Sequence, residues 1–420
     1  VLSLLGKEQA VNSQVWDAIL VPPTIAPELR GKFKGMVQAA ICFLDLKRTL
    51  DMAKLTALYH PSLDEQRACE EAVVELCRQA LSYLESNVKD PGLLKTDSEI
   101  VQKVMLIWSC NSFEGGRIYE SISRINHSCN PNAVVVVVPD NSEGQKIVAA
   151  TNIKSGDEIS ISYLDHMLLY ADTATRRAEL ESTKHFVCNC TRCSSVDDLA
   201  AYVPCPTCHP RRQTGNKHCL EEDVQYDDEL SVRYVALIPG KATTCAHCNA
   251  ILDPQGDHKA LSTVCQSVIR KATHFIKDYT TRKSADDDDV DGDEAEEIQR
   301  DALQQQLTVC SSMLGALHWT TNILMLLHLD VEWQHLHDAL FIGSGLKLSE
   351  QMDGIAERID MLERIVRFVE GLHLSINPAH LISDVVIAAA RALTSSRTYL
   401  HWPTAHCDRF RGVKSCTKRA

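Results

Sequence analysis

The sequence has no apolar run that approaches the roughly 18 residues of a membrane span, and its N-terminus lacks the charged-then-apolar layout of a secretory signal. It also lacks an excess of positive charge, since 56 acidic residues against 43 Lys and Arg give a formal net charge of -13. The first two absences exclude a membrane partner and predict the cytoplasm or the nucleus as the compartment. The third argues against nucleic acid as a partner, although local basic patches can exist within such an average.

What is present is enough apolar material for a folded protein of two or three domains, because 45% of the 420 residues are hydrophobic. The 17 cysteines are the more telling feature. In a reducing compartment cysteines are better explained by metal binding than by disulfides. The chain begins with Val1 rather than Met, so we expect a fragment.

The first part of the chain predicts helices. Residues 64–86 carry apolar residues at helical spacing, and a second helix is expected to begin near the capping residues 96–99. The predicted apolar face of the first helix consists of Val73, Leu76, Cys77, Ala80, Leu81 and Leu84.

Short strands separated by turn residues come next. They are predicted at 133–138, 145–150 and 159–163. From about residue 259 the pattern is helical again and favours a stacked, TPR-like array, although no clean 34-residue repeat is present.

The first cysteine motif is Cys188-x-Cys190-x-x-Cys193. This spacing lets three thiolates meet one ion, and a tetrahedral zinc site needs a fourth ligand. Cys129 is the candidate for that ligand.

Two C-x-x-C pairs follow, Cys205/Cys208 and Cys245/Cys248, and together they predict a closed four-sulfur zinc site. A redox-active pair is the alternative, but no strand–helix pattern of the thioredoxin kind surrounds either pair. Other side chains that could replace a sulfur are His209, His218, Cys219 and His247.

Three motifs in one order resemble a known family. They are Asn126-His127-Ser128-Cys129-x-Pro131-Asn132, Gly156-Asp157-Glu158-Ile159-x-Ile161-x-Tyr163 and Phe186-x-Cys188-x-Cys190-x-x-Cys193. Their order and spacing are similar to the catalytic half of SET-domain protein lysine methyltransferases. The chain is most similar to the SET-and-MYND subfamily, in which Asn111-Ser112-Phe113 also has a counterpart. The resemblance is specific over about residues 98–193 and looser to 250.

The resemblance implies an α+β fold, with a SET-type β-fold, a helical insert, a cysteine-rich zinc-binding post-SET segment and an all-α C-terminal domain. The implied boundaries are 1–97 for a helical inter-SET-like region, 98–187 for the SET core, 188–255 for the post-SET region, 256–398 for the helical domain with an acidic linker at 284–297, and 399–420 for a basic tail.

The implied activity is S-adenosylmethionine-dependent N-methylation of a lysine in a protein substrate, histone or non-histone, with the helical C-terminal domain able to bind a peptide. Zn²⁺ would be structural, in one or two sites. The cofactor would be bound at a knot formed by the Asn-His-Ser segment and the strand ending in Tyr163. Its implied contacts are Asn111, Ser123, Asn126, His127 and Phe186.

Tyr163 is the implied catalytic residue, because methyl transfer is an in-line displacement that requires an aligned, neutral amine. Taken alone, Tyr163 is better explained as an ordinary strand tyrosine and His127 as a structural histidine. Only the coupled cysteine motifs favour the catalytic interpretation.

The sequence also departs from the family. Residues 1–97 contain neither the glycine-rich G-x-G turn nor the closely spaced Cys and His of a MYND finger, and Lys184 stands where many relatives have a second tyrosine. We therefore expect an incomplete gene product or a degenerate enzyme. Two alternatives to the enzyme remain: a catalytically inactive, zinc-bearing scaffold for protein partners, and a zinc-ribbon nucleic-acid binder. The acidic charge counts against the second.

An acidic run at 286–297 partly resembles a calcium-binding EF-hand loop. Position twelve of that loop would be Ile298, where a bidentate Glu is required. A solvated acidic linker is the favoured interpretation.

Overall fold

The structure, a computed structural model, describes most of the chain. The described residues are 19–46, 50–62, 70–87, 91–113, 116–137, 144–195, 198–208, 234–238, 240–284, 292–342, 348–372 and 374. They form two compact units: residues 1–163 with 177–190, and residues 164–176 with 191–420. The expected basic tail at 399–420 lies outside the described residues, as do His209, His218 and Cys219.

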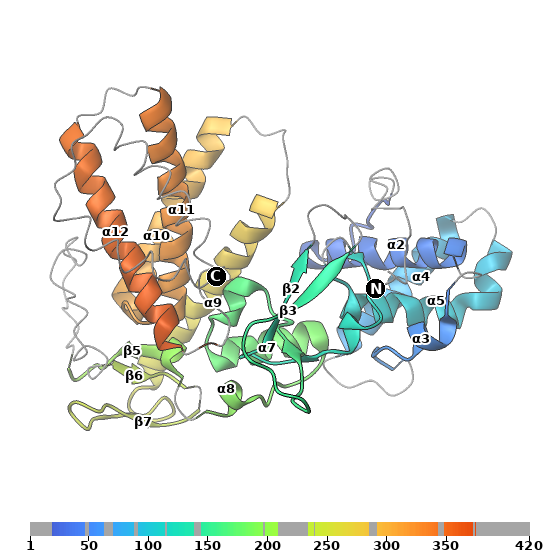
Figure 1. The fold of residues 1–420 in the computed structure, drawn as a ribbon, viewed down its shortest axis with the longest axis horizontal. Coiled ribbons are helices and arrows are strands. Elements are labelled where there is room, and N and C mark those ends of the chain that lie inside the picture. The colour runs from blue at the N-terminus through green and yellow to red at the C-terminus, as the bar shows by residue number, and fades with distance from the viewer. Residues whose placement is uncertain are drawn as a thin grey trace. The chain divides into compact units, whose positions relative to one another are not determined.

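The first unit begins with helices that build its larger core (Figure 1). They are η1 (Pro27–Leu29), α2 (Arg30–Leu46), α3 (Met52–Thr56), α4 (Glu71–Asn87) and α5 (Pro91–Asn111). The apolar face predicted for residues 64–86 is confirmed, since all six of its members are buried in α4.

Helix α5 begins at Pro91, about five residues before the expected start at 96–99. The physical reason is that proline is favoured in the first turn of a helix. The N–H groups there have no hydrogen-bond partner within the helix, so proline, which lacks this N–H, loses no hydrogen bond.

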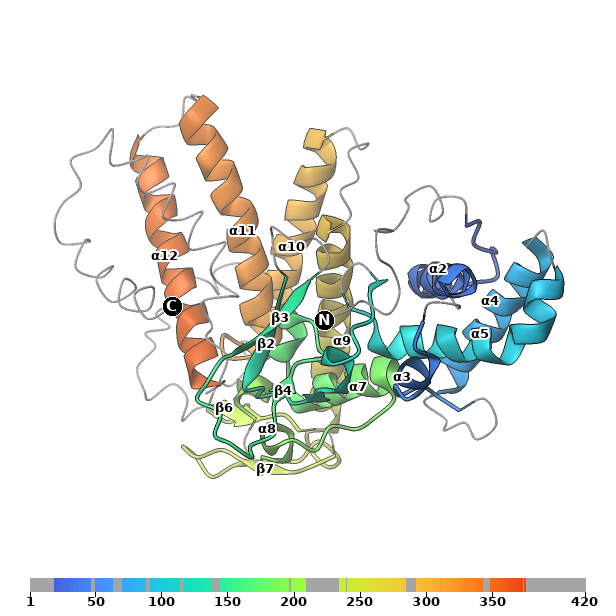
Figure 2. The same cartoon turned by 45° about the vertical axis from the view of Figure 1, so that its right-hand side comes forward.

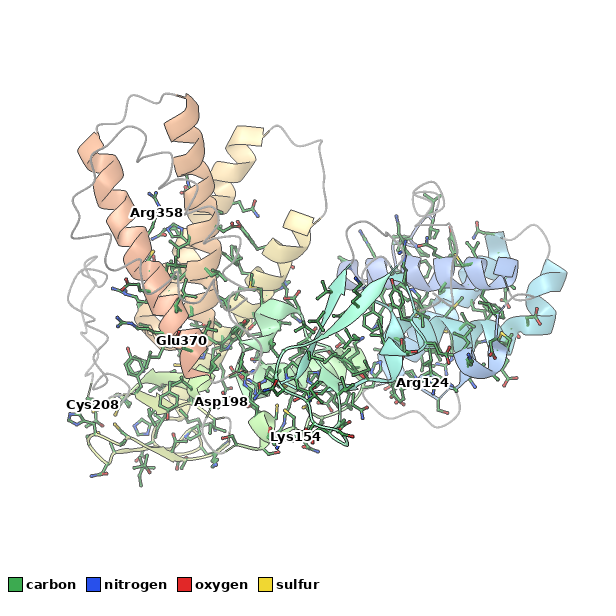
Figure 3. The ribbon with its side chains drawn as sticks, viewed as in Figure 1. Arg124, Lys154, Asp198, Cys208, Arg358 and Glu370 are labelled. Atoms are coloured by element: carbon green, nitrogen blue, oxygen red, sulfur yellow. The ribbon has the colours of Figure 1, made fainter. Side chains whose placement is uncertain are left out.

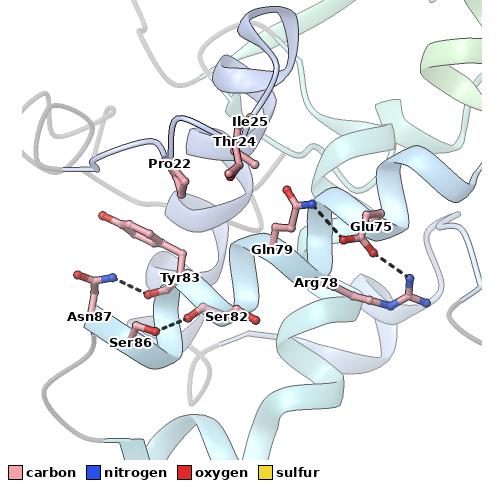
Figure 4. A pocket seen from close by; sticks show the side chains of 10 residues that line it. All are labelled: Pro22, Thr24, Ile25, Glu75, Arg78, Gln79, Ser82, Tyr83, Ser86 and Asn87. Carbon is pink, nitrogen blue, oxygen red and sulfur yellow. Dashed lines mark hydrogen bonds and ion pairs between the residues drawn. The ribbon is translucent and has the colours of Figure 1, made fainter.

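Helices α2 and α5 contact each other closely at Gly35, because a Cβ atom there would lie 1.9 Å from the indole ring of Trp108. The Trp108 Nε1–H donates a hydrogen bond of 2.9 Å to the Gly116 carbonyl, which fixes the ring. A groove of about 460 Å³ opens elsewhere on this helical layer, beside Tyr83 and the Glu75–Arg78 ion pair of α4 (Figure 4). Its lining includes none of the predicted site residues.

The strands of the first unit come in two pairs (Figure 2). Strand β1 (Asn126–His127) pairs in parallel with β4 (Ser160–Ile161), and β2 (Ala133–Val137) pairs antiparallel with β3 (Gln145–Ala149). All three predicted strands are therefore found, although β4 covers only two residues of the expected 159–163. Tyr119, Ile122, Ala133 and Ile161 form a second, smaller core under these strands.

The second unit is mainly helical. Short elements come first: α6 (His166–Leu169), α8 (Thr191–Ser194), η4 (Leu199–Ala201), β5 (Tyr202–Pro204) paired with β6 (Tyr234–Ala236), and β7 (Thr243–Thr244) paired with β8 (Ile251–Leu252). Long helices follow: α9 (Lys259–Ser284), α10 (Gly292–Leu314), α11 (Trp319–Ile342) and α12 (Leu348–Gly371). Helix α7 (Thr173–Lys184) contributes residues to both units.

The predicted helical C-terminal region is confirmed over its described part. The acidic run was expected to be a linker up to residue 297. Its last part, residues 292–297, is helical instead, because α10 begins at Gly292. Within the described part of the chain, every helix is too short or too polar to cross a membrane.

Candidate active site and metal centres

The parallel pair β1–β4 brings the Asn-His-Ser segment beside a segment more than thirty residues later. Asn126 lies opposite Ser160, and His127 lies opposite Ile161. Asn132 ties the same segments together, since its Nδ2 donates to the Glu158 carbonyl at 2.8 Å and its Oδ1 accepts the Ser160 N–H at 2.8 Å. Two such short strands need this side-chain support, because each offers few backbone hydrogen bonds.

His127 is held at both ring nitrogens. Its Nδ1 accepts the backbone N–H of Tyr163 at 2.9 Å, which leaves the proton of the neutral imidazole on Nε2. Nε2 lies 3.2 Å from the sulfur of Cys129, so this N–H points at a cysteine that belongs to the first metal cluster. The His127 side chain thus connects the predicted catalytic residue with a predicted zinc ligand.

Three aromatic rings meet at the end of β4. The Tyr163 ring lies 5.3 Å from the His127 ring and 6.3 Å from the Phe186 ring, between centroids, and His127 and Phe186 are 5.9 Å apart. The Tyr163 hydroxyl donates a hydrogen bond of 2.5 Å to the Ile125 carbonyl. Burial raises the pKa of Tyr163, so this hydroxyl keeps its proton at neutral pH.

Lys184, the last residue of α7, also lies close to the Tyr163 ring. Its Nζ donates a hydrogen bond of 2.8 Å to the Cys110 carbonyl and lies 5.7 Å from the centroid of the Tyr163 ring. Burial lowers the pKa of Lys184. The following residue, His185, is buried and has a left-handed φ of 64°, and this turn carries the chain from Lys184 to Phe186.

The remaining predicted cofactor contacts are Asn111, Ser123 and Asn126, and each makes hydrogen bonds within the first unit. Asn111 is buried, and its Nδ2 donates to the carbonyls of Tyr59 and Ile107, both at 2.7 Å. Ser123 donates its hydroxyl to the Asn111 carbonyl at 3.4 Å. The Asn126 amide donates to Glu158 at 2.7 Å.

The first cysteine cluster is assembled as the spacing predicts. The sulfurs of Cys129, Cys188, Cys190 and Cys193 all lie within 4.8 Å of one another, and those of Cys129 and Cys188 are 4.0 Å apart. A tetrahedral zinc site with Zn–S bonds of about 2.3 Å places its sulfurs about 3.8 Å apart, so this cluster could hold zinc. Three of the four cysteines are buried, and Cys190 is partly exposed. Four thiolates leave no open position, as in structural zinc sites.

The second cluster is assembled from the two C-x-x-C pairs, whose members are Cys205, Cys208, Cys245 and Cys248. Its sulfurs also lie within 4.8 Å of one another, with 3.6 Å from Cys205 to Cys248 and 3.7 Å from Cys208 to Cys245. These separations again match a tetrahedral four-sulfur site. Figure 3 labels Cys208 beside the short strands of the second unit. His247, the alternative ligand, is not part of the cluster.

The second C-x-x-C pair, Cys245/Cys248, lies on a defined backbone turn. The Asn249 N–H donates to the Cys245 carbonyl at 2.9 Å, and Asn249 has a left-handed φ of 58°. Asparagine tolerates this conformation better than most residues, so the sequence around Cys245 and Cys248 suits the turn.

The comparisons with known proteins agree with this geometry. A family model of the SET domain matches residues 38–164. The chain contains a SET domain. It is 28% identical over 137 residues to histone-lysine N-methyltransferase SMYD3 of Mus musculus, which is 30% of each chain. It is 33% identical over 124 residues to N-lysine methyltransferase SMYD2 of Homo sapiens, 27% of each chain. A third relative is histone-lysine N-methyltransferase SET5 of Saccharomyces cerevisiae, 32% identical over 101 residues, 24% of this chain and 18% of that protein.

These alignments span less than a third of the relatives' lengths. The recognition of a SET domain with SET-and-MYND relatives is confirmed. The matched SET-domain range includes Asn111, Ser123, Asn126, His127, Cys129 and Tyr163, whereas Phe186 and the other seven cysteines of the two clusters follow it. It begins at residue 38, well before the expected boundary at 98, so it takes in the helices α4 and α5.

The sequence named Asn132 and Lys184 but did not predict their contacts in the candidate site. Asn132 appeared only as the last residue of the first motif, and its two hydrogen bonds to the second segment have no local signal. The contact between Lys184 and the Cys110 carbonyl joins residues 74 positions apart. The only signal in the sequence was the place of Lys184 two residues before Phe186, where many relatives have a second tyrosine.

Proposed function

We propose that this chain is an S-adenosylmethionine-dependent protein-lysine N-methyltransferase. The observation that carries the proposal is the position of Tyr163, whose N–H donates to His127 and whose ring contacts Phe186. Three separate segments, which match the three motifs, meet at this one side chain. The SET-domain match and the methyltransferase relatives support the same activity.

The residues proposed to hold the cofactor surround the β1–β4 pair: Asn111, Ser123, Asn126, His127 and Phe186. Both ring nitrogens of His127 are engaged within the chain, so its side chain would hold the segment that binds the cofactor in place. Phe186 offers an aromatic face to a purine ring. When bound, the cofactor supplies an electrophilic methyl group on a sulfonium.

Tyr163 is proposed to align the acceptor amine. Its hydroxyl proton is donated to the Ile125 carbonyl, so the lone pairs of the oxygen would be available to accept a hydrogen bond from an incoming amine. A lysine ammonium must lose a proton before it can react, and half-buried surroundings favour its neutral form. Positioning therefore provides most of the rate enhancement in this site.

Zinc is assigned a structural role. Cys129 follows His127 by two residues, and its sulfur lies within 4.8 Å of those of Cys188, Cys190 and Cys193. An ion bound there would fix the Asn-His-Ser segment and the start of the post-SET segment as one piece. Phe186 precedes Cys188 by two residues, so the same ion would also restrict the position of its ring.

The substrate is proposed to be a protein with a target lysine, histone or non-histone, as the names of the relatives suggest. We also propose that the helices α9 to α12 bind a peptide and that the protein acts in the nucleus or the cytoplasm.

An inactive scaffold is the second candidate, and one observation favours it. Both amide hydrogens of Asn111 are used by backbone carbonyls, which leaves only its Oδ1 for a cofactor.

Calorimetry on the zinc-loaded full chain separates the two candidates. The enzyme predicts saturable binding of S-adenosylmethionine and transfer of labelled methyl groups to a histone mixture. Tyr163→Phe should abolish the transfer and leave zinc content and cofactor affinity unchanged. Tyr83→Phe, which loses a hydroxyl on α4 outside the site, is the matched control. No heat of binding at millimolar cofactor would leave the scaffold as the better reading.

A further inference from the structure

The amine of Lys184 lies inside the candidate active site rather than at the surface. Its Nζ is 2.8 Å from the Cys110 carbonyl, next to Asn111 in the chain, and 5.7 Å from the centroid of the Tyr163 ring. An acceptor lysine of a substrate would have to bring its own amine to Tyr163. Lys184 therefore places an amine beside the side chain to which the proposed reaction must bring a substrate amine.

The backbone fixes this placement. Lys184 ends α7, and the left-handed, buried residue His185 turns the chain so that Phe186 also meets Tyr163. A non-glycine residue in this conformation costs about 1 kcal/mol or more and persists only where the surroundings hold it. The side chains on both sides of the turn are thus directed to the same ring.

The surroundings also favour an uncharged amine. Burial is the main cause that lowers the pKa of Lys184, and the nearby charge of Lys32 acts in the same direction, while the Cys110 thiol acts against them. The Cys110 carbonyl can accept a hydrogen bond from a neutral amine as well as from an ammonium. A neutral amine is the nucleophilic form of lysine.

We infer that Lys184 is a methylation site of this chain, modified in cis by its own SET domain. This inference rests on the proposed function, which supplies S-adenosylmethionine as the methyl donor. The Nζ lone pair forms the new N–C bond as the methyl–sulfonium bond breaks, and that electron pair stays on sulfur to give the neutral thioether S-adenosylhomocysteine. The methylated ammonium then releases one proton to water.

The experiment uses the zinc-loaded full chain and a trideuteromethyl-labelled donor. Mass spectrometry of proteolytic peptides should find the label on Lys184 and not on its neighbour Lys32. The labelled fraction per molecule should not change on tenfold dilution, because an intramolecular reaction is independent of concentration. Lys184→Arg should remove the label from that peptide and leave donor binding measurable by calorimetry.

Two results would overturn the inference. One is donor binding with label on added histone but none on Lys184, which would leave the proposed function intact. The other is a labelling rate that rises in proportion to chain concentration, which would show transfer between molecules. Absence of any donor binding would instead remove the proposed function, and the inference with it.

A second measurement needs no donor. In competitive acylation of the zinc-loaded chain, Lys184 should react much more slowly than Lys154, which is exposed. Equal reaction rates would show an amine open to solvent and would contradict the placement on which the inference depends.

Discussion

The Nδ1 atom of His127 accepts the backbone N–H of Tyr163 at 2.9 Å, across 36 residues of sequence. The same ring presents its other nitrogen to the sulfur of Cys129 at 3.2 Å. One imidazole therefore supports both the end of β4 and a ligand of the first cysteine cluster.

The first prediction concerns this imidazole. His127→Phe keeps an aromatic ring but leaves the Tyr163 N–H without its acceptor, so the free energy of unfolding should fall by about 1–3 kcal/mol. Zinc should also leave the first cluster faster, because the N–H···S hydrogen bond to Cys129 is lost. Urea unfolding and chelator-induced zinc release measure the two effects. His274→Gln, at an exposed position of α9, should change neither value; equal values for both variants would contradict the linking role.

The second prediction concerns zinc stoichiometry. Two four-sulfur clusters predict two zinc ions per chain by elemental analysis. Cys129→Ser and Cys205→Ser should each reduce the content to one ion, because each removes a ligand from a different cluster.

Cys77→Ala is the control for this series. Cys77 is buried in α4, and burial raises the pKa of its thiol to about 12, so it is not a thiolate ligand. The variant should keep two ions although it loses some core packing. A chain that keeps two ions after Cys205→Ser would disprove the second site.

The third prediction compares two glycines of α2. Gly35→Ala should destabilise the first unit by about 1–3 kcal/mol, because its Cβ would lie 1.9 Å from the fixed indole of Trp108. Gly31 has no atom within 4 Å of the same added carbon, so Gly31→Ala should stabilise the helix by up to about 1 kcal/mol. Urea unfolding measures both, and effects of the same sign would contradict the close packing of α2 on α5.

The fourth prediction concerns acid stability. His318 is fully buried before α11, and burial lowers its pKa from 6.5 to about 3. Between these values the unfolded chain binds a proton that the folded chain does not, so the free energy of unfolding falls as the pH falls. From pH 6.5 to pH 5 the loss attributable to His318 is about 2 kcal/mol.

His318→Gln tests this effect, because glutamine keeps hydrogen-bonding capacity without titrating. Unfolding free energies at pH 7 and pH 5 should differ less in the variant than in the parent chain. Zinc thiolates titrate in both proteins and cancel in the comparison. An unchanged difference would show that the pKa of His318 is the same in the folded and the unfolded chain.

Most of the features that could be predicted from the sequence depend on the spacing of residues that are close together in the chain. The apolar period of α4, the turn residues around β2 and β3 and the two cysteine patterns each act over a few residues, and all of them are found in the structure. The start of α5 at Pro91 was missed although proline in the first turn is itself a local signal.

Contacts between distant residues could not be predicted in the same way. The bonds of Asn132 to β4 and of Lys184 to Cys110 join residues 26–28 and 74 positions apart, and no periodicity encodes them. The roles of Asn111, Ser123, Asn126, His127, Tyr163 and Phe186 therefore remain predictions that rest on the family resemblance. For His127, Tyr163 and Phe186 the contact of their three rings supports them as well.

The parallel pairing of β1 with β4 has a kinetic consequence. The β2–β3 hairpin lies between the two partners and can close on the microsecond scale, whereas the β1–β4 pairing joins residues 34 positions apart by only two residues on each strand. In a long-range pairing of this kind, the entropy of closing the loop is lost before the contacts that stabilise the pairing can form. The hairpin should therefore form early during refolding, and the ring cluster around Tyr163 should become ordered among the last parts of the chain.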